Sequence, residues 1–197
     1  GRASVAEVTK STPPAELIIG SVKGRRMATT SFVLAEERRM IEFARTGRGT
    51  RRPLGDPARS MSREWLGDDQ RGAVRHVLGS RDRVIVVRGA AGVGKTSLMQ
   101  EAAEGIREGG RELFVFAPTA GASRGVLRQE GFDTADTVAR LLADAAIQER
   151  VRGQVIWIDE AGLLGSKTMA RVFDLAGRAD ARVVLSGDRR QHRAVER

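Results

Sequence analysis

From about residue 66 onward, short apolar runs alternate with segments whose apolar residues recur at helical spacing. The apolar runs have the length and composition of buried strands, and they lie at residues 84–87, 113–116, 155–158 and 182–185. The amphipathic segments predict helices over residues 69–78, 95–108, 120–129, 136–150 and 167–176. This alternation is typical of a parallel sheet covered by helices on both faces, so the predicted fold class is α/β.

The earlier part of the chain follows a different pattern. Its first thirty residues are loop-like, with one short candidate strand at 17–19, and a helix is predicted over 31–45. The stretch at 47–59 is rich in Gly, Arg and Pro and is predicted to be a linker or an exposed loop. We therefore expect a flanking segment over residues 1–65 and a sheet-containing domain over 66–197. Because the chain starts with Gly1 and stops inside a charged run, we expect it to be a piece of a longer protein.

Composition narrows the class of protein. The 197 residues contain no Cys, which excludes a disulfide framework and a thiolate metal site. No apolar stretch has the length of a signal or membrane-spanning segment, so a cytoplasmic location without membrane contact is the default. The net charge of +9 fits a nucleic-acid partner, but the basic residues are scattered and nearly all Arg. A solvated surface and a nucleic-acid footprint therefore both stay open on charge alone.

A glycine-rich turn directly follows the first apolar run. Residues 89–96 read Gly-Ala-Ala-Gly-Val-Gly-Lys-Thr, a complete P-loop, in which small residues let backbone N–H groups and a helix N-terminus face phosphates. Lys95 is expected to reach the β- and γ-phosphates, and the Thr96 hydroxyl to ligate Mg²⁺. The predicted cofactors are ATP and Mg²⁺, and the predicted nucleotide-binding residues of this loop are Gly89, Ala90, Ala91, Gly92, Val93, Gly94, Lys95, Thr96 and Ser97.

Two carboxylates, Asp159 and Glu160, follow the apolar run at 155–158, as in a Walker B element. Asp159 is expected to hold Mg²⁺, and Glu160 to orient and deprotonate the attacking water. The alternative is a pair of acidic residues at the start of the next helix. Trp157, inside the run, is expected to be a core residue rather than a platform for stacking bases.

Three further polar positions are candidates. Gln191 follows the last apolar run and is expected to sense the γ-phosphate or its attacking water. Pro118 and Thr119 follow the run at 113–116, where they either hold a phosphate of a bound nucleic-acid strand or cap the next helix. Gln70 opens the first helix of the sheet domain, and its amide offers the donor and acceptor that read an adenine edge.

Taken in this order, these motifs resemble the first RecA-like motor domain of superfamily 1 DNA helicases of the RecD-like branch. Residues 71–78, 159–166 and 187–197 are similar to the helicase half of MobF-type conjugative relaxases, and the resemblance covers about residues 66–197. It implies an ATPase that moves 5′ to 3′ on single-stranded DNA. It also implies that Thr137, with Thr134 and Arg140, belongs to a strand-contacting element.

The chain departs from that family in three respects. Gly72 stands where such helices more often carry Ala, which costs helix stability. No second RecA-like domain with arginine fingers follows, and there is no Tyr to serve as the relaxase nucleophile. The resemblance therefore implies a second RecA-like domain downstream in the parent chain as a partner, and little ATP turnover by this piece alone. A P-loop phosphotransferase and a non-catalytic nucleotide- or DNA-binding module stay open as alternatives.

Overall fold

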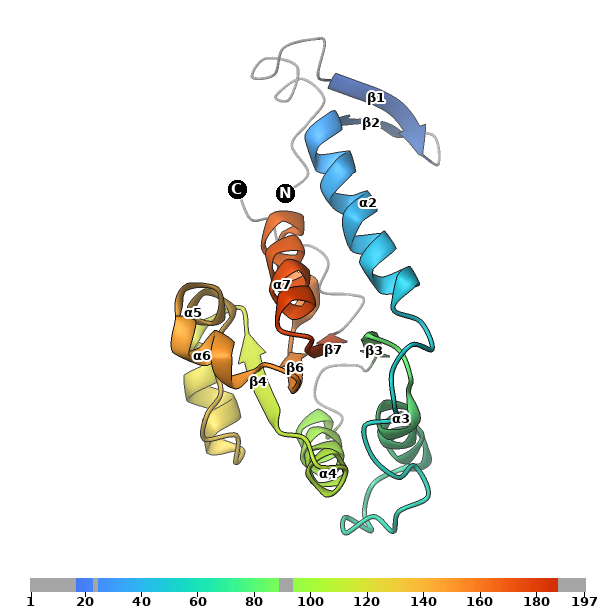
Figure 1. Ribbon diagram of the computed structural model, residues 1–197, viewed down its shortest axis with the longest axis vertical. Helices are drawn as coiled ribbons and strands as arrows, with labels where there is room; N and C mark the ends of the chain where they lie inside the picture. Colours follow the sequence, from blue (N-terminus) through green and yellow to red (C-terminus); the bar gives the residue numbers. More distant parts are fainter. Residues whose placement is uncertain (1–16, 23–24, 89–93, 188–197) are drawn as a thin grey trace.

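The computed structural model describes residues 17–22, 25–88 and 94–187 of the chain. Its centre is a parallel sheet of five strands in the order β3-β7-β6-β4-β5 (Figure 1). The strands are β3 (Val84–Arg88), β4 (Leu113–Ala117), β5 (Asp136–Thr137), β6 (Val155–Ile158) and β7 (Arg182–Gly187). The predicted fold class is confirmed.

Alternate side chains of the central strands enter two separate cores, one on each face of the sheet. Trp157 of β6 and Val184 of β7 pack with α3 (Asp68–Gly79) and α4 (Lys95–Glu108). Ile156 and Val183 pack on the opposite face with α5 (Val138–Ala143) and α7 (Ser166–Arg178). Burial on both faces explains why these strands appear in the sequence as unbroken apolar runs.

One predicted helix is wrong. Residues 136–150 form β5, then α5, then α6 (Ala145–Arg150), rather than a single helix. The break lies at Asp144, whose backbone is extended and whose carboxylate accepts hydrogen bonds from the N–H groups of Ala146 and Ile147. A short polar side chain that caps the next helix outweighs the apolar periodicity at this point. The helix predicted at 120–129 exists, but it begins as the π-helix η2 (Gly121–Leu127).

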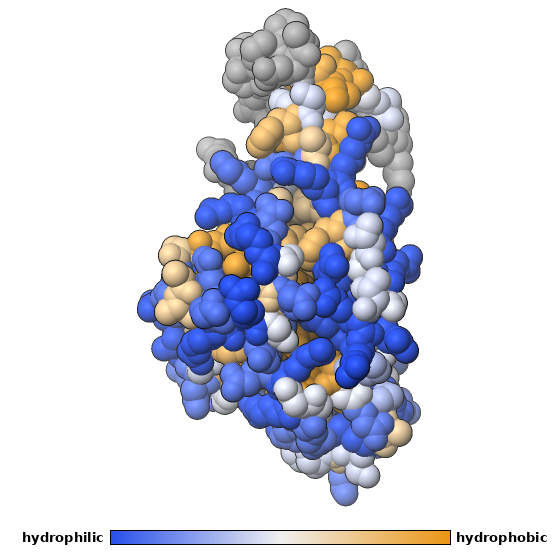
Figure 2. Space-filling model, viewed as in Figure 1, coloured by the Kyte–Doolittle hydropathy of each residue, from blue (hydrophilic) through white to orange (hydrophobic). Residues whose placement is uncertain are grey.

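The first elements form a hairpin and a long helix that extend from one end of the molecule (Figure 1). β1 (Leu17–Val22) pairs antiparallel with β2 (Arg25–Thr30), a strand not expected from the sequence, and α2 (Ser31–Thr46) follows. Figure 2 shows a mostly hydrophilic face with apolar atoms gathered at this end, where Ile18, Ile19 and Phe32 are exposed.

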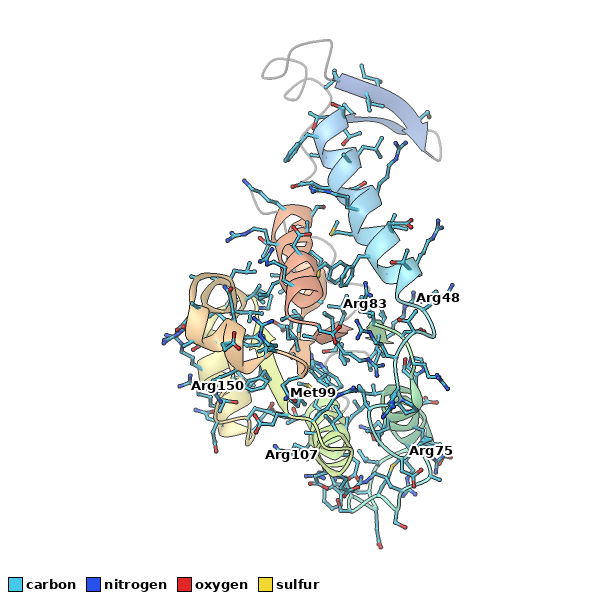
Figure 3. All side chains as sticks on the ribbon, viewed as in Figure 1. Arg48, Arg75, Arg83, Met99, Arg107 and Arg150 are labelled. Atoms are coloured by element: carbon cyan, nitrogen blue, oxygen red, sulfur yellow. The ribbon has the colours of Figure 1, made fainter. Side chains whose placement is uncertain are left out.

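The far end of α2 is fixed to the sheet domain by aromatic contacts. The Phe43 ring stacks on Phe173 of α7 with ring centroids 5.2 Å apart, and the Arg83 guanidinium lies 4.8 Å from the Phe43 ring centre. Figure 3 shows Arg83 beside the lower end of α2. Both contacts join the flanking helix to residues that directly border β3 or cover the sheet.

The stretch predicted as a linker or exposed loop, residues 47–59, contains no helix or strand and is mostly exposed, and it is anchored on the sheet domain at Leu54. Leu54 has no exposed surface, and its N–H donates to the Leu78 carbonyl at 2.8 Å. Close backbone approach requires glycine here, because a Cβ on Gly109 would lie 2.1 Å from the Leu54 carbonyl oxygen. Within the stretch itself, a Cβ on Gly55 would lie 2.4 Å from the Gly105 carbonyl oxygen, so this glycine also serves close packing.

Candidate functional site

The start of α4 contains the described end of the P-loop. Gly94 precedes the helix with φ of +61°, a left-handed backbone that favours glycine. A Cβ at this position would also lie 2.5 Å from Nε2 of Gln70. Residues Gly89, Ala90, Ala91, Gly92 and Val93 lie outside the described part of the chain, so their predicted phosphate contacts stay predictions.

Lys95 and Asp159 come together at the carboxyl edge of the sheet. Asp159 follows β6 and is largely buried, and its Oδ1 lies 2.7 Å from Nζ of Lys95. The P-loop lysine and the acidic residue predicted to hold Mg²⁺ therefore belong to one site, although they are 64 positions apart. In open parallel sheets ligands bind at this edge.

Buried neighbours hold the Asp159 carboxylate in place. Ser186, in β7, donates from Oγ to Asp159 Oδ1 at 2.8 Å and accepts from the Trp157 Nε1–H at 2.8 Å. Trp157 has no exposed surface, so its predicted role as a core residue is confirmed. Sequence reasoning assigned no role to Ser186. The sequence does show that Ser186 follows a buried apolar run, and a hydroxyl buried at such a position needs hydrogen-bond partners.

Glu160 has a strained backbone. Its φ of +51° and ψ of 36° lie in the left-handed region, which is costly for a residue with a Cβ. Strain of this kind persists only where the surrounding structure enforces it, and it collects at functional sites. The end of β7 approaches the same turn, since a Cβ on Gly187 would lie 3.5 Å from the backbone nitrogen of Gly162.

Gln70 lies beside the described end of the P-loop. Its Nε2 donates to the Gly94 carbonyl at 3.1 Å, and its Oε1 accepts from the Gly67 N–H at 2.8 Å. The second bond satisfies a free N–H at the start of α3. The position is next to the nucleotide loop, as expected, while recognition of adenine stays a prediction.

Thr96 makes a contact that the sequence did not suggest. Its hydroxyl donates to Oε2 of Glu130 at 2.7 Å, and Glu130 lies just after η2. Ser97, the next predicted nucleotide-binding residue, is half-buried on the first turn of α4.

The residues predicted to contact a nucleic-acid strand act as local caps in this structure. Thr119 Oγ1 accepts from the Ala122 N–H at 3.2 Å, and Thr137 Oγ1 accepts from the Arg140 N–H at 3.1 Å. Pro118 is half-buried and Thr119 is exposed. Both segments lie at the carboxyl edge, because Ala117 pairs with Thr137. Strand binding stays a prediction for all three.

Three arginines surround a buried carboxylate beside these residues, and sequence reasoning missed the group. Asp136 contacts Arg124 at 2.9 Å, Arg128 at 3.6 Å and Arg140 at 3.7 Å. Burial tends to raise the pKa of Asp136, but the Thr137 N–H and Arg124 hold that pKa below its usual value. The arginine side chains are 41–51% exposed, so one buried anion fixes three cations that still face solvent. We call Arg124, Arg128 and Arg140 the arginine cluster.

A surface cavity of about 660 Å³ lies elsewhere, at the amino end of β4. Its lining includes Arg107, Arg111 and Phe114, and the guanidinium of Arg150 lies 5.1 Å from the Phe114 ring centre (Figure 3). None of the residues predicted to bind nucleotide lines it. The chemistry predicted from the sequence gathers at the other edge of the sheet.

The remaining predicted residue, Gln191, lies outside the described residues, as does His192. Within the described ranges no group of three or more His, Cys, Asp or Glu could hold a metal ion, and no helix is long and apolar enough to cross a membrane. The Thr96 hydroxyl and the Asp159 carboxylate supply the oxygen ligands that Mg²⁺ prefers, and Mg²⁺ completes its coordination with water and substrate phosphates. This donor set fits Mg²⁺ bound together with a nucleotide.

A parallel sheet, a left-handed glycine before a Lys-Thr helix start, and a buried aspartate paired with that lysine define a P-loop nucleotide-binding domain of the RecA-like kind. Comparison with known families is consistent with this class. Residues 65–197 match the family described as AAA domain, and the chain belongs to that family.

Similar proteins carry names from bacterial conjugation. The chain is 34% identical over 153 residues to the conjugal transfer protein TraA of Rhizobium radiobacter. The aligned residues make up 77% of this chain and 14% of that protein. It is 30% identical over 168 residues to the multifunctional conjugation protein TraI of Escherichia coli K12, which covers 81% of this chain and 10% of that protein. The predicted relationship to conjugation proteins is confirmed. The chain spans about a tenth to a seventh of the length of these relatives.

Proposed function

We propose that this chain is the ATP-binding motor domain of a 5′-to-3′ DNA helicase within a conjugation protein. The observation that carries the proposal is the 2.7 Å contact between Lys95 and Asp159, because it joins the P-loop and the Walker B position in one site. The names of the relatives, a conjugal transfer protein and a multifunctional conjugation protein, support the biological setting. ATP and DNA must meet in one compartment, so the proposal includes a cytoplasmic location.

The proposed roles follow the chemistry of each side chain. Lys95 neutralises the β- and γ-phosphates, and Thr96 and Asp159 hold Mg²⁺, which supplies charge stabilisation when bound. Glu160 accepts a proton from the attacking water, and the strain in its backbone supports a role that folding alone does not require. Gln70 reads adenine, and Gln191 senses the γ-phosphate.

Single-stranded DNA is the proposed second ligand. Pro118, Thr119 and Thr137 lie at the same sheet edge as the arginine cluster, whose exposed guanidinium groups suit phosphates. We also propose that a second RecA-like domain in the parent chain supplies an arginine to the γ-phosphate, since such a residue is worth about 10³ to 10⁵ in rate in related enzymes. The chain alone should therefore bind Mg²⁺-ATP with little turnover.

The nucleotide site is tested by Lys95→Ala. The substitution removes the charge that the P-loop brings to the phosphates, so affinity for a fluorescent ATP analogue should fall by about tenfold or more. Lys167→Ala, an exposed lysine at the start of α7, is the matched control and should bind as the unaltered chain does.

Equal binding by the Lys95→Ala variant would reject the P-loop site. The helicase assignment needs a further measurement in the parent protein, where single-stranded DNA should accelerate phosphate release. ADP formation that requires a small-molecule acceptor, with the γ-phosphoryl group transferred to that acceptor, would indicate a phosphotransferase. Nucleotide binding without any turnover would indicate a non-catalytic module.

A further inference from the structure

Glu130 contacts α4 at two points. Its carboxylate accepts from the Thr96 hydroxyl at 2.7 Å, and its backbone carbonyl accepts from Nε2 of Gln100 at 2.6 Å. Thr96 and Gln100 are four residues apart and so lie on one face of the helix. These two bonds fix both the backbone and the side chain of Glu130 against the helix that carries the P-loop lysine.

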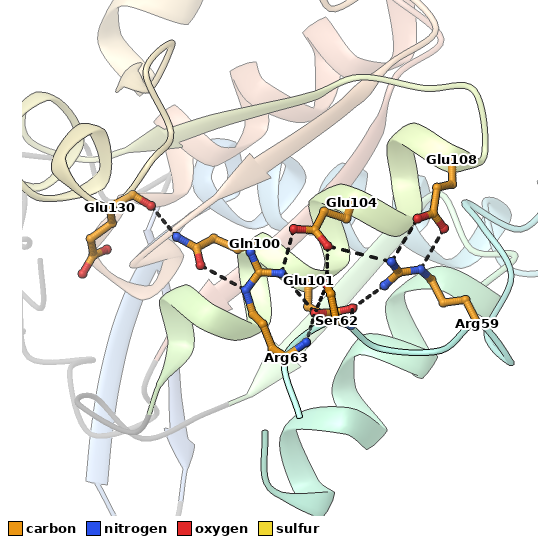
Figure 4. A network of polar contacts seen from close by, with 8 residues as sticks. All are labelled: Arg59, Ser62, Arg63, Gln100, Glu101, Glu104, Glu108 and Glu130. Atoms are coloured by element: carbon orange, nitrogen blue, oxygen red, sulfur yellow. Dashed lines mark hydrogen bonds and ion pairs between the residues drawn. The ribbon is translucent and has the colours of Figure 1, made fainter. Parts of the chain in front are cut away.

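The orientation of Gln100 is itself set by a larger network, shown in Figure 4. Its Oε1 accepts from Nε of Arg63 at 3.2 Å, which leaves Nε2 to donate to Glu130. Arg63 is held in turn by Glu101 at 3.0 Å and Glu104 at 2.8 Å. The contacts beneath Glu130 therefore continue through Gln100 and Arg63 to the buried Glu101.

The Thr96 hydroxyl has one hydrogen to donate and two lone pairs. Donation to Glu130 directs the hydrogen toward that carboxylate, and the lone pairs then point elsewhere. A metal ligand needs a lone pair and not the hydrogen, so the bond to Glu130 and a bond to Mg²⁺ are compatible. A carboxylate behind a neutral ligand also makes its oxygen a better donor and adds negative charge near the cation.

We propose that Glu130 is a positioning residue that orients the Thr96 hydroxyl for Mg²⁺ and thereby raises the affinity of the site for Mg²⁺-nucleotide. The inference rests on the proposed function, because it takes Thr96 as the ligand of a nucleotide-bound metal. It adds a residue that no P-loop or Walker B pattern contains.

The test separates binding of nucleotide from binding of the metal. A fluorescent ATP analogue is titrated into the chain with EDTA and then over a range of Mg²⁺ concentrations, for Glu130→Ala and Glu130→Gln. Glu112→Gln is the control, because it removes the same charge from an exposed side chain. Circular dichroism melting of each variant checks that the fold is intact.

For Glu130→Ala, the Mg²⁺ concentration that gives half of the increase in affinity should rise about 10- to 100-fold, with binding in EDTA unchanged. Glu130→Gln keeps an acceptor oxygen for Thr96 and should show a smaller rise. An unchanged Mg²⁺ dependence in both variants overturns the proposal, and so does an equal loss of binding with and without Mg²⁺, which a merely structural role would cause.

Failure of the proposed function gives a different result. In that case the unaltered chain itself does not bind the nucleotide, or binds it equally well after Lys95→Ala, and the role of Glu130 falls with it.

Discussion

At the scale of single residues, Glu160 combines a backbone cost with a proposed chemical role. A left-handed backbone costs roughly 1 kcal/mol or more for a residue with a Cβ, and glycine escapes this cost. The sequence supplies Glu at this position all the same. A residue that lowers stability and is present nevertheless is expected to contribute something other than stability.

Glu160→Gly is therefore expected to raise the free energy of unfolding by up to about 1 kcal/mol, as measured by urea denaturation. Glu37→Gly, at an exposed position inside α2, is the matched control and should lower it by about 1 kcal/mol. In the parent protein both Glu160→Gly and Glu160→Gln should retain nucleotide binding and lose hydrolysis. Full hydrolysis in either would reject Glu160 as the base.

At the scale of elements, several ion pairs join α4 to the preceding segment, and the buried carboxylate among them is Glu101. Glu101 has no exposed surface and contacts Arg59, Arg63 and Ser62 (Figure 4). Burial tends to raise the pKa of Glu101, but hydrogen bonds from Arg63 and Arg59 and from the Ser62 and Arg63 N–H groups lower it to about 2. The charged form is thus strongly favoured in the folded protein.

This pKa makes stability depend on pH in a defined direction. The folded pKa lies below the usual value of 4.5, so the stabilisation is complete above that value and is lost as pH falls toward 2. Between pH 6 and pH 3 the loss should reach about 2 kcal/mol of unfolding free energy from this group. Urea denaturation at both pH values measures it.

Glu101→Gln isolates the contribution, because the amide does not titrate. Between pH 6 and pH 3 the Glu101→Gln variant should lose about 2 kcal/mol less unfolding free energy than the unaltered chain. At pH 6 the variant itself should be less stable than the unaltered chain. Glu112→Gln should show the full loss. A pH dependence that Glu101→Gln leaves untouched would mean that other carboxylates carry it.

The elements also show what the sequence could and could not predict. Runs such as residues 155–158 identify strands because burial on both faces requires unbroken apolar residues. β5 was missed since two residues beside Ala117 carry no periodicity, and β2 was missed since Arg and Thr fill it. Motif spacing correctly placed Lys95 near Asp159, because both follow strands of one parallel sheet.

Partners that depend on three-dimensional contact were beyond the sequence. Ser186 lies 27 positions from Asp159, and Glu130 lies 34 positions from Thr96. Neither separation is part of a sequence motif, since a hydroxyl or a carboxylate can reach Asp159 or Thr96 from any neighbouring element. The position of Ser186 at the end of a buried strand shows that its hydroxyl needs partners, but only the structure shows which residues they are.

At the scale of the whole molecule, most basic residues are scattered, but the arginine cluster concentrates three positive charges around Asp136. For single-stranded DNA each neutralised phosphate contributes about −0.7 to the slope of log affinity against log salt concentration. Arg124→Ala and Arg140→Ala should each weaken binding of a labelled oligonucleotide and reduce the steepness of that slope by about 0.7. Fluorescence anisotropy at several salt concentrations measures both quantities.

Arg75→Ala is the control, because it removes the same charge from an exposed position on α3, and Figure 1 shows α3 on the opposite side of the view from α5, which contains Arg140. For Arg75→Ala, the slope of log affinity against log salt concentration should equal that of the unaltered chain. Equal effects of all three substitutions would show that net charge, and not the arginine cluster, attracts the strand.

The contacts of Glu101 extend beyond the residues that match the AAA domain family. The family match begins at residue 65, whereas Arg59, Ser62 and Arg63, which surround this buried carboxylate, all precede it. A gene fragment cut at residue 65 would keep every nucleotide motif and strand of the sheet, yet it would lack Arg59 and Arg63, the two cations that Glu101 contacts. A fragment of this domain for use in another protein should therefore include the end of α2 as well, because Phe43 already stacks on Phe173 of α7 and the Gly47 carbonyl accepts from the Arg83 N–H.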